Sequence, residues 1–404
     1  MLKHLHCTAI WALFTLLLPA LLSSALHAQT LQVLYTFHGP NGDRPLGQLT
    51  LDGAGNIYGT TAEGGTGTCE MGCGTVFGIS EGGKLLGSYS FHGEDGAVPE
   101  AGLLLDSGGN LFGTTENGGN YNQNCGGASG LGCGVVFKLT PKGKETVYKF
   151  TGNGPIFPSG NLVQDAAGNL YGTTIWSGRS GGGTVFKLDQ SGKLTVLQGL
   201  PSRECTALGL IMFGTDLYGS STGNNCGFSY IFQMTTDGSY TAIGSGASYP
   251  SILTADGAGN LYGDTSNAGL DYGSVFRISP DGNGRWTQTT LYKFCQLPPG
   301  CSDGEFPRGT VAIDTAGNIY GTTTEGGTSQ NCNGAGCGVV FKLDPNGNET
   351  VIHNFTGEAD GAFPQGGLIV DSAGNLYGTT PTGGDPYCTP PDPRGCGVVF
   401  KITP

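Results

Sequence analysis

The stretch GNLYGTT, Gly168–Thr174, returns letter for letter at Gly374–Thr380. Five further variants of it occur in the chain, and consecutive copies begin 44 to 59 residues apart. Aligned on the first residue of the motif, the copies begin at Gly55, Gly109, Gly168, Thr215, Gly259, Gly317 and Gly374. A period of this length is typical of β-propeller blades and is too long for ankyrin or leucine-rich repeats.

Each copy reads as four short strands separated by turns. In the second copy we predict strands at Gly102–Asp106 (GLLLD), Asn110–Thr115 (NLFGTT), Gly134–Leu139 (GVVFKL) and Glu145–Phe150 (ETVYKF). Turns such as DSAGN, Asp371–Asn375, carry the Asp, Asn and Gly that tight turns favour. Gly is 76 of 404 residues and only 12% of residues are charged, which leaves little material for amphipathic helices. One four-stranded antiparallel blade per copy follows.

The two ends of the chain supply the missing parts of one blade. The last copy stops after GVVFKITP, Gly397–Pro404, and lacks a fourth strand. The segment LQVLYTF, Leu31–Phe37, has the pattern of a fourth strand without the first three. Pairing the two closes the ring and removes exposed sheet edges. The sequence therefore predicts an all-β, seven-bladed β-propeller of four-stranded antiparallel blades, closed by the N-terminal strand.

One aromatic position recurs in the second strand of every copy. It is held by Tyr58, Phe112, Tyr171, Tyr218, Tyr262, Tyr320 and Tyr377. We interpret these rings as packing one blade against the next. The alternative is a set of rings that stack on a ligand.

The first 28 residues have the pattern of a secretory signal peptide. Lys3 precedes the apolar run Ala9–Leu22, and small residues follow up to Ala28. A membrane-spanning helix is the alternative, but the run is shorter than the roughly 20 residues that a span needs. We predict a signal peptide at residues 1–28, a propeller domain at 29–404, a secreted or periplasmic protein, and no membrane span after cleavage.

Twelve cysteines follow the predicted signal peptide, and they fall into six local pairs. The pairs are Cys69 with Cys73, Cys125 with Cys133, Cys205 with Cys226, Cys295 with Cys301, Cys332 with Cys337, and Cys388 with Cys396. An even number of cysteines in an exported chain indicates disulfides. Zinc is the weaker alternative, because the pairs are spread over different copies with no second pair or His cluster nearby.

With its GNLYGTT and GVVFKL segments, the chain resembles the GloVer tandem-repeat family of secreted bacterial proteins. The resemblance covers nearly all of the chain after the signal peptide. It implies export. It brings no catalytic residues with it, so any catalytic residues stay unknown at this point.

The propeller topology sorts the loops by face. The loop between strands two and three lies on the same side as the link from one blade to the next, and we call this side the top face. All six cysteine pairs fall there, together with many acids. The candidate ligand-binding residues are Glu63, Asp95, Glu116, Asp303, Glu325 and Asp360. Acidic loops that only maintain solubility and a cation or polyol site are both consistent with this pattern.

The net charge and the motifs limit the classes of partner and cofactor that we expect. A net charge of −13 disfavours nucleic acid, so we expect a glycan or an envelope or extracellular protein as partner, and a monomeric chain. No loop has the DxDxDG spacing of a calcium loop, so we predict no cofactor and no metal, with calcium left as a possibility. His38 and His92 follow a Phe at equivalent positions and either form an acid–base pair or are ordinary repeat variation.

Our leading hypothesis is a secreted binding or scaffold module whose ligand site lies on the acidic, disulfide-stapled top face. The alternative is a carbohydrate-active hydrolase or lyase that uses top-face carboxylates, because a glycosidase needs two acids about 5–10 Å apart. A purely structural role is the third possibility. Whether the protein is an enzyme stays open from the sequence.

Overall fold

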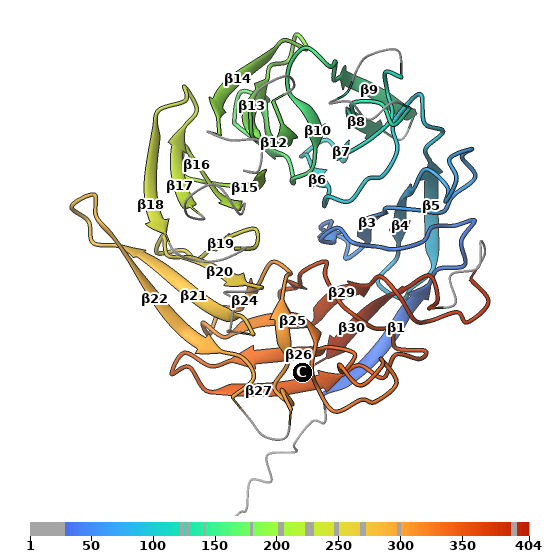
Figure 1. Cartoon of the computed structure of the whole chain (residues 1–404), viewed down its shortest axis with the longest axis vertical. Helices are drawn as coiled ribbons and strands as arrows, with labels where there is room; N and C mark the ends of the chain where they lie inside the picture. The colour runs from blue at the N-terminus through green and yellow to red at the C-terminus, as the bar shows by residue number, and fades with distance from the viewer. Residues whose placement is uncertain are drawn as a thin grey trace, which may run out of the picture.

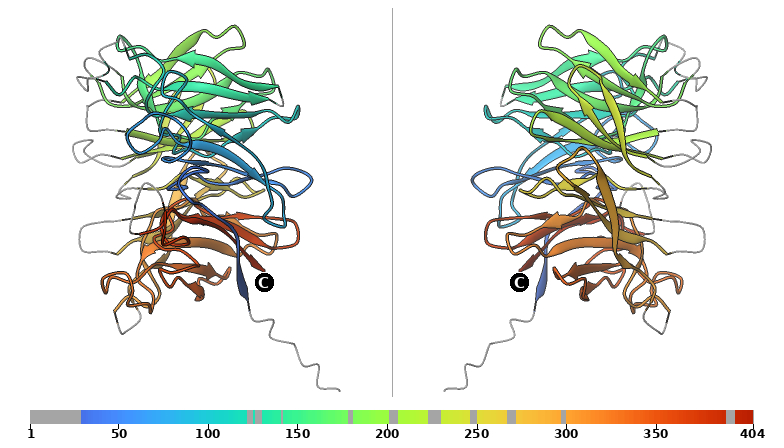
Figure 2. Two further views of the ribbon diagram at one scale, coloured as in Figure 1. Left: turned by 90° about the vertical axis from the view of Figure 1, so that its right-hand side faces the viewer. Right: turned by 90° about the vertical axis from the view of Figure 1, so that its left-hand side faces the viewer.

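The computed structural model forms a ring of seven antiparallel sheets around a central axis (Figure 1). It describes residues 29–121, 125, 130–140, 142–177, 181–200, 206–222, 230–245, 250–266, 272–296, 300–388 and 394–403. The strands run between the two faces of the ring, as the side views show (Figure 2). The chain is a seven-bladed β-propeller, as the repeat predicts.

The first four blades follow one another along the chain. Blade 1 contains β2 (Thr50–Leu51), β3 (Ile57–Thr61), β4 (Thr75–Ile79) and β5 (Leu85–Ser90). Blade 2 contains β6 (Leu104–Leu105), β7 (Leu111–Thr115), β8 (Val135–Thr140) and β9 (Gly143–Lys149). Blade 3 contains β10 (Ile156–Pro158), β11 (Val163–Gln164), β12 (Leu170–Trp176), β13 (Thr184–Leu188) and β14 (Leu194–Gly199). Blade 4 contains β15 (Thr206–Phe213), β16 (Asp216–Thr222), β17 (Tyr230–Thr235) and β18 (Tyr240–Ser245).

The last three blades complete the ring. Blade 5 contains β19 (Thr254–Ala255), β20 (Leu261–Thr265), β21 (Ser274–Pro280) and β22 (Trp286–Lys293). Blade 6 contains β23 (Glu305–Pro307), β24 (Ala312–Ile313), β25 (Ile319–Glu325), β26 (Val339–Leu343) and β27 (Glu349–Asn354). Blade 7 contains β28 (Ile369–Val370), β29 (Leu376–Thr380), β30 (Val398–Thr403) and β1 (Thr30–Thr36).

The N-terminal strand closes the ring. Strand β1 pairs antiparallel with β30 in the register Leu31 to Ile402 and Tyr35 to Val399. Blade 7 is therefore assembled from both ends of the chain, which confirms the closure predicted from the two incomplete copies. The closure gives blade 7 its fourth strand, so β30 is paired on both of its edges.

The turn between the first and second strands uses the same Asp and Asn in six blades, and a Tyr as well in five of them, because blade 2 has Phe112 instead. In blade 7, Asp371 Oδ1 accepts hydrogen bonds from the backbone N–H groups of Ala373 and Asn375, at 2.9 Å each. Its Oδ2 accepts from Asn375 Nδ2 at 2.7 Å and Tyr377 Oη at 3.0 Å. The repeated Asp, Asn and Tyr are thus one hydrogen-bonded unit. Blade 4 departs from it with a tight turn that pairs Phe213 with Asp216.

The glycine of the motif is a packing requirement. A Cβ atom on Gly113 would lie 2.5 Å from Phe137 Cζ, the ring that the GVVFKL strand contributes to the core. The same glycine in the other six blades meets the equivalent Phe at 2.4 to 2.8 Å. The strand-two glycine and the strand-three phenylalanine therefore form a matched pair, and both recur for that reason.

Aromatic rings join the blades to one another. The Phe after the fourth strand of one blade meets the strand-three Phe of the next edge to face, as in Phe37 with Phe77 at 5.0 Å between ring centroids and Phe355 with Phe400 at 5.3 Å. The strand-two rings lie in the same clusters, each with residues of the following blade. The prediction that these rings pack between blades is confirmed.

The innermost strand differs from the prediction. Where we predicted a strand at Gly102–Asp106, only Leu104–Leu105 pairs with β7. The residues before it bond to the neighbouring blade instead: Thr60 Oγ1 donates to Ala101 O at 2.9 Å, and Thr50 Oγ1 donates to Leu103 O at 2.6 Å. Hydrogen bonds between blades have replaced the ladder within the blade, and these segments converge on the axis.

Within the described residues, no helix is long and apolar enough to cross a membrane. The predicted signal peptide, residues 1–28, lies outside the described residues and stays a prediction.

Candidate functional site

Disulfides close the loops of the top face. Five of the predicted pairs are bonded in the structure: Cys69–Cys73, Cys125–Cys133, Cys295–Cys301, Cys332–Cys337 and Cys388–Cys396. Four of them lie between the second and third strands of their blades, and Cys295–Cys301 lies in the link from blade 5 to blade 6. The sixth predicted pair, Cys205 with Cys226, falls outside the described residues. Five disulfides indicate an oxidising, extracellular or periplasmic environment.

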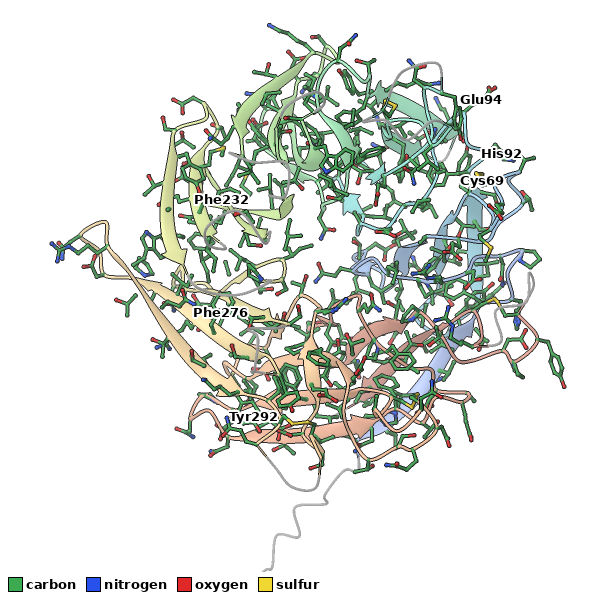
Figure 3. All side chains as sticks on the ribbon, in the orientation of Figure 1. Cys69, His92, Glu94, Phe232, Phe276 and Tyr292 are labelled. Carbon is green, nitrogen blue, oxygen red and sulfur yellow. A yellow bond between two sulfur atoms is a disulfide. The ribbon has the colours of Figure 1, made fainter. Side chains whose placement is uncertain are left out.

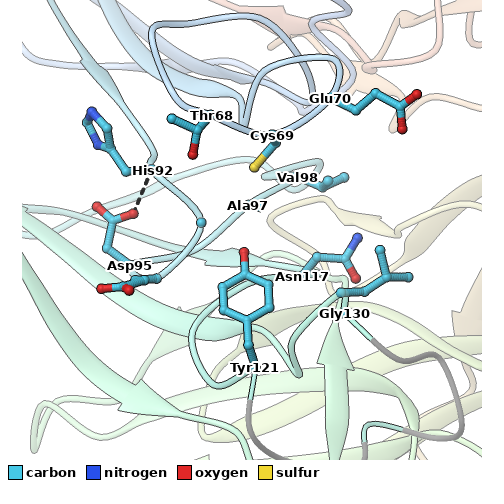
Figure 4. Close-up of a pocket in the computed structure, with 13 residues that line it drawn as sticks. Thr68, Cys69, Glu70, His92, Asp95, Ala97, Val98, Asn117, Tyr121 and Gly130 are labelled. Atoms are coloured by element: carbon cyan, nitrogen blue, oxygen red, sulfur yellow. Dashed lines mark hydrogen bonds between the residues drawn. The ribbon is translucent and has the colours of Figure 1, made fainter.

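A hollow of about 690 Å³ lies on this face between blades 1 and 2 (Figure 4). The strand-two to strand-three loop of blade 1, the link into blade 2 and the corresponding loop of blade 2 enclose it. Its lining includes the Cys69 disulfide, His92, Asn117 and Tyr121. Figure 3 shows Cys69, His92 and Glu94 close together at the rim of the ring. We call this hollow the top pocket.

The top pocket combines acids with a ring. Glu70, Glu94 and Asp95 all line it. The Tyr121 side chain is 40% exposed and points its hydroxyl into the pocket (Figure 4). Burial, followed by the negative charges of Asp95 and Glu94, raises the pKa of Tyr121, so its hydroxyl stays protonated and can donate. Such a surface offers a ring face together with hydrogen-bonding groups of both kinds.

Three candidate residues mainly hold the links between blades. Asp360 accepts from His353 Nε2 and from the Thr356 backbone N–H, each at 3.0 Å. Although burial raises its pKa, hydrogen bonds from His353 and Thr356 hold the pKa of Asp360 below its usual value. Asp95 and Asp303 make the equivalent bonds to Tyr89 and Tyr292. These bonds hold the segments that lead from one blade into the inner strand of the next.

Two other candidates converge with an acid that sequence reasoning missed. Glu63 forms an ion pair with Arg44, with 2.5 Å between Oε1 and Nη1. Glu100 interacts with both of these residues. Burial raises the pKa of Glu100 most, the Arg44 charge lowers it and the Glu63 charge raises it, so that the net change is an increase. Burial and then the charge of Glu100 raise the pKa of Glu116 to about 7. Glu63, Glu100 and Glu116 therefore form a carboxyl cluster between blades 1 and 2, and we call it the glutamate cluster.

The last candidate, Glu325, lies at the junction of blades 5 and 6. Burial, then the charges of Glu325 and Asp303, raise the pKa of Glu305. The six candidates are thus divided among several junctions. They do not form one central site.

The two histidines also lie apart. His38 Nδ1 is 2.6 Å from Asp385 Oδ2, which comes from the strand-two to strand-three loop of blade 7. His92 lines the top pocket, and its backbone N–H donates to Asp95 Oδ1 at 2.8 Å. The structure places them at different blade junctions, so it gives no support to the acid–base pair.

Polar side chains fill the axis of the ring. A cavity of about 90 Å³ is lined by the inner segments of six blades, including Gln48, Glu100, Asn161 and Arg308. Asn161 Oδ1 accepts from the Gly102 backbone N–H at 2.7 Å, and Gln48 Nε2 donates to Leu368 O at 3.3 Å. Among the described residues, this cavity leaves little space for a ligand on the axis itself. A PxG sequence precedes the inner strand in blades 1, 3, 6 and 7, and it was the available signal for the axial residues of those blades.

Comparisons with known proteins find a repeat family that matches part of the chain and solved structures with a similar fold. The model of the Gloeobacter/Verrucomicrobia repeat matches residues 211–404. No curated protein matches the chain in sequence. Among solved structures, an ulvan lyase from a new family of polysaccharide lyases is 11% identical with a TM-score of 0.51, over 85% of this chain and 89% of that chain. A periplasmic gluconolactonase of Pseudomonas aeruginosa is 16% identical with a TM-score of 0.48, over 88% of this chain and 93% of that chain. At these identities the likeness concerns the fold alone.

Proposed function

Residues 211–404 match the Gloeobacter/Verrucomicrobia repeat family. Because this match brings no established chemistry, we propose a function from the site itself. The protein is a secreted propeller binding module, and its ligand site is the top pocket. The ligand class that fits best is a glycan or another polyol. The single observation that carries this proposal is the pocket of about 690 Å³ on the top face, whose loops are closed by disulfides.

The lining supports a polyol more than a charged polymer. The ring of Tyr121 offers an apolar face on which a sugar ring can stack, while Asn117 and the carboxylates of Glu70 and Glu94 can bond hydroxyl groups. Acids dominate the charge of the pocket, so an anionic ligand would be repelled. A neutral or cationic sugar is therefore favoured over a sulfated or uronic one.

The experiment is a binding screen of the oxidised mature chain on a panel of neutral, amino and acidic glycans. We expect saturable binding to a neutral or amino glycan, at least tenfold weaker after Tyr121→Ala. Tyr387→Ala is the matched control, because Tyr387 is 84% exposed in the equivalent loop of blade 7 but does not line the top pocket. Equal binding by all three proteins, or no binding on the whole panel, would contradict the proposal.

A second candidate function is supported by the glutamate cluster. Glu116, with a pKa of about 7, can donate a proton near neutral pH, while Glu63 is ion-paired with Arg44. Two carboxyl groups in different environments are what a hydrolase or lyase uses as acid and base. Product released from a polysaccharide panel by the wild type, and abolished by Glu116→Gln without loss of binding, would establish this activity in place of simple binding.

A further inference from the structure

The links between blades repeat one arrangement around an acid. Between blades 1 and 2, Asp95 accepts a hydrogen bond from the Tyr89 hydroxyl. The ammonium group of Lys144, in β9, lies 3.8 Å from Asp95 Oδ2 and donates to the Asp95 backbone carbonyl at 2.6 Å. The Lys144 side chain is only 4% exposed. A buried positive charge therefore neutralises the link acid at this junction.

The junction of blades 5 and 6 keeps the acid and reverses the charge beside it. Asp303 Oδ2 accepts from Tyr292 Oη at 2.8 Å and from the Gln296 backbone N–H at 3.2 Å. In blade 2, Lys144 pairs with Leu139, the Leu that ends the VVFKL segment. In blade 6, Glu349 occupies this position, because it pairs with the equivalent Leu343. Where blade 2 puts an ammonium group beside the link acid, blade 6 puts a second carboxyl group.

Asp303 is buried, Glu349 is partly buried, and both carboxyl groups are incompletely hydrogen-bonded among the described residues. Asp303 is fully buried, and its Oδ1 has no hydrogen-bond partner among the described residues. Glu349 Oε1 is buried and likewise has no such partner within the described part of the chain. Burial, and next the charge of Asp303, raise the pKa of Glu349 to about 7. A fully buried acid that interacts electrostatically with a partly buried one is costly unless a positive charge compensates them.

We propose that Asp303 and Glu349 bind a hard metal cation of the calcium class, in the place that the Lys144 ammonium group takes in blade 2. Carboxylate oxygens are the ligands that such cations prefer. The Cys295–Cys301 disulfide braces the link that carries Asp303, and Gly304 N–H donates to Cys301 O at 2.9 Å. Glu305 and Glu325 add negative charge nearby. The site lies at a different junction from the top pocket, so it does not depend on the proposed function.

The test compares thermal unfolding of the oxidised mature chain in chelator and in calcium, with a direct calcium titration alongside. The wild type should gain about 3 to 5 °C in Tm at calcium a hundredfold above its Kd. Glu349→Lys restores the charge found in blade 2. Its Tm in chelator should equal or exceed that of the wild type in chelator, and its calcium-dependent shift should disappear together with one bound ion in the titration.

Lys144→Glu is the reciprocal variant. It creates the acid pair of blade 6 at the blade 2 junction, so its Tm in chelator should fall and calcium should restore part of the loss. Two results would overturn the proposal. An equal calcium shift in the wild type and Glu349→Lys would place the calcium elsewhere. No shift with calcium, magnesium or manganese, together with a wild-type Tm that rises from pH 8 to pH 6 in chelator, would mean that the two acids share a proton instead.

Discussion

The first prediction concerns the stability effect of the motif glycine in blade 3, which packs against buried side chains. In Gly172→Ala the new Cβ would lie 2.6 Å from Phe186 Cζ and 2.7 Å from Leu162 Cδ2, both in buried side chains. The backbone of Gly172 does not have a positive φ, so the effect is steric alone. Overpacking a closed core costs about 1–3 kcal/mol. We therefore expect a loss of about 2 kcal/mol, seen as a lower denaturant midpoint of the oxidised chain with an unchanged m value.

Gly87→Ala is the matched control for this substitution. Gly87 is exposed in β5, and a Cβ there would meet nothing within 4 Å. That change should be neutral or should stabilise by about 0.4–1 kcal/mol, because alanine restricts the unfolded chain. Combining Gly172→Ala with Phe186→Leu should cost less than the sum of the two single changes, since the smaller side chain makes room for the methyl group. Equal denaturant midpoints for Gly172→Ala and Gly87→Ala would refute the close packing of the motif glycine against the strand-three phenylalanine.

Three further predictions concern charge, turns and loop closure. Burial raises the pKa of Glu116 in the folded chain to about 7, above its ordinary value of 4.5, so its contribution to stability is full below pH 4.5 and is lost as the pH rises to 7. Glu116→Gln should remove about 3 kcal/mol of this pH dependence, measured as Tm between pH 4 and pH 8. Asp371→Ala removes four hydrogen bonds from one turn and should cost about 1–3 kcal/mol, which an unchanged denaturant midpoint would disprove. Replacing Cys69 and Cys73 by Ser opens a loop whose disulfide has a sequence separation of only 4, so stability should fall by at most about 2 kcal/mol. Glycan binding, measured by titration, should weaken more than tenfold. Intact binding would argue against a role for this loop.

A fully buried acid at a repeat position gives one more prediction. Asp264 stands where the other blades have Thr or Ser, and neither of its carboxyl oxygens has a hydrogen-bond partner among the described residues. Burial raises the pKa of Asp264 well above its ordinary value, so the chain loses stability as the pH rises through the folded pKa. Asp264→Thr should raise Tm by several degrees at pH 8 and leave it nearly unchanged at pH 4; a lower Tm at pH 8 would contradict this account.

The fold could be predicted from the sequence because each blade contains the same local structural units. The Asp, Asn and Tyr of one turn, and the Gly with its facing Phe, are local units that recur with their spacing, so their structure follows from their sequence. Ring closure followed from two incomplete copies. Five cysteine pairs were predictable because each pair closes a single loop.

The site was less predictable because it depends on contacts between loops of different blades. The approach of Glu100 to Glu63 and Glu116 arises where one inner segment leaves its own sheet to bond the neighbouring blade. The two-residue β6 has the same cause, since propensity alone favours a longer strand there. Glu349 is an exception: aligning the fourth strands would have revealed an acid in the position of Lys144.

The measurement that tests the central claim most directly is hydrogen exchange of the oxidised mature chain with and without the strongest-binding glycan of the panel. Binding in the top pocket predicts slower exchange in residues 92–98 and at Asn117 and Tyr121, with no change in the turns of the opposite face. Protection confined to those opposite turns, or to a different blade junction, would contradict the assignment of the ligand site.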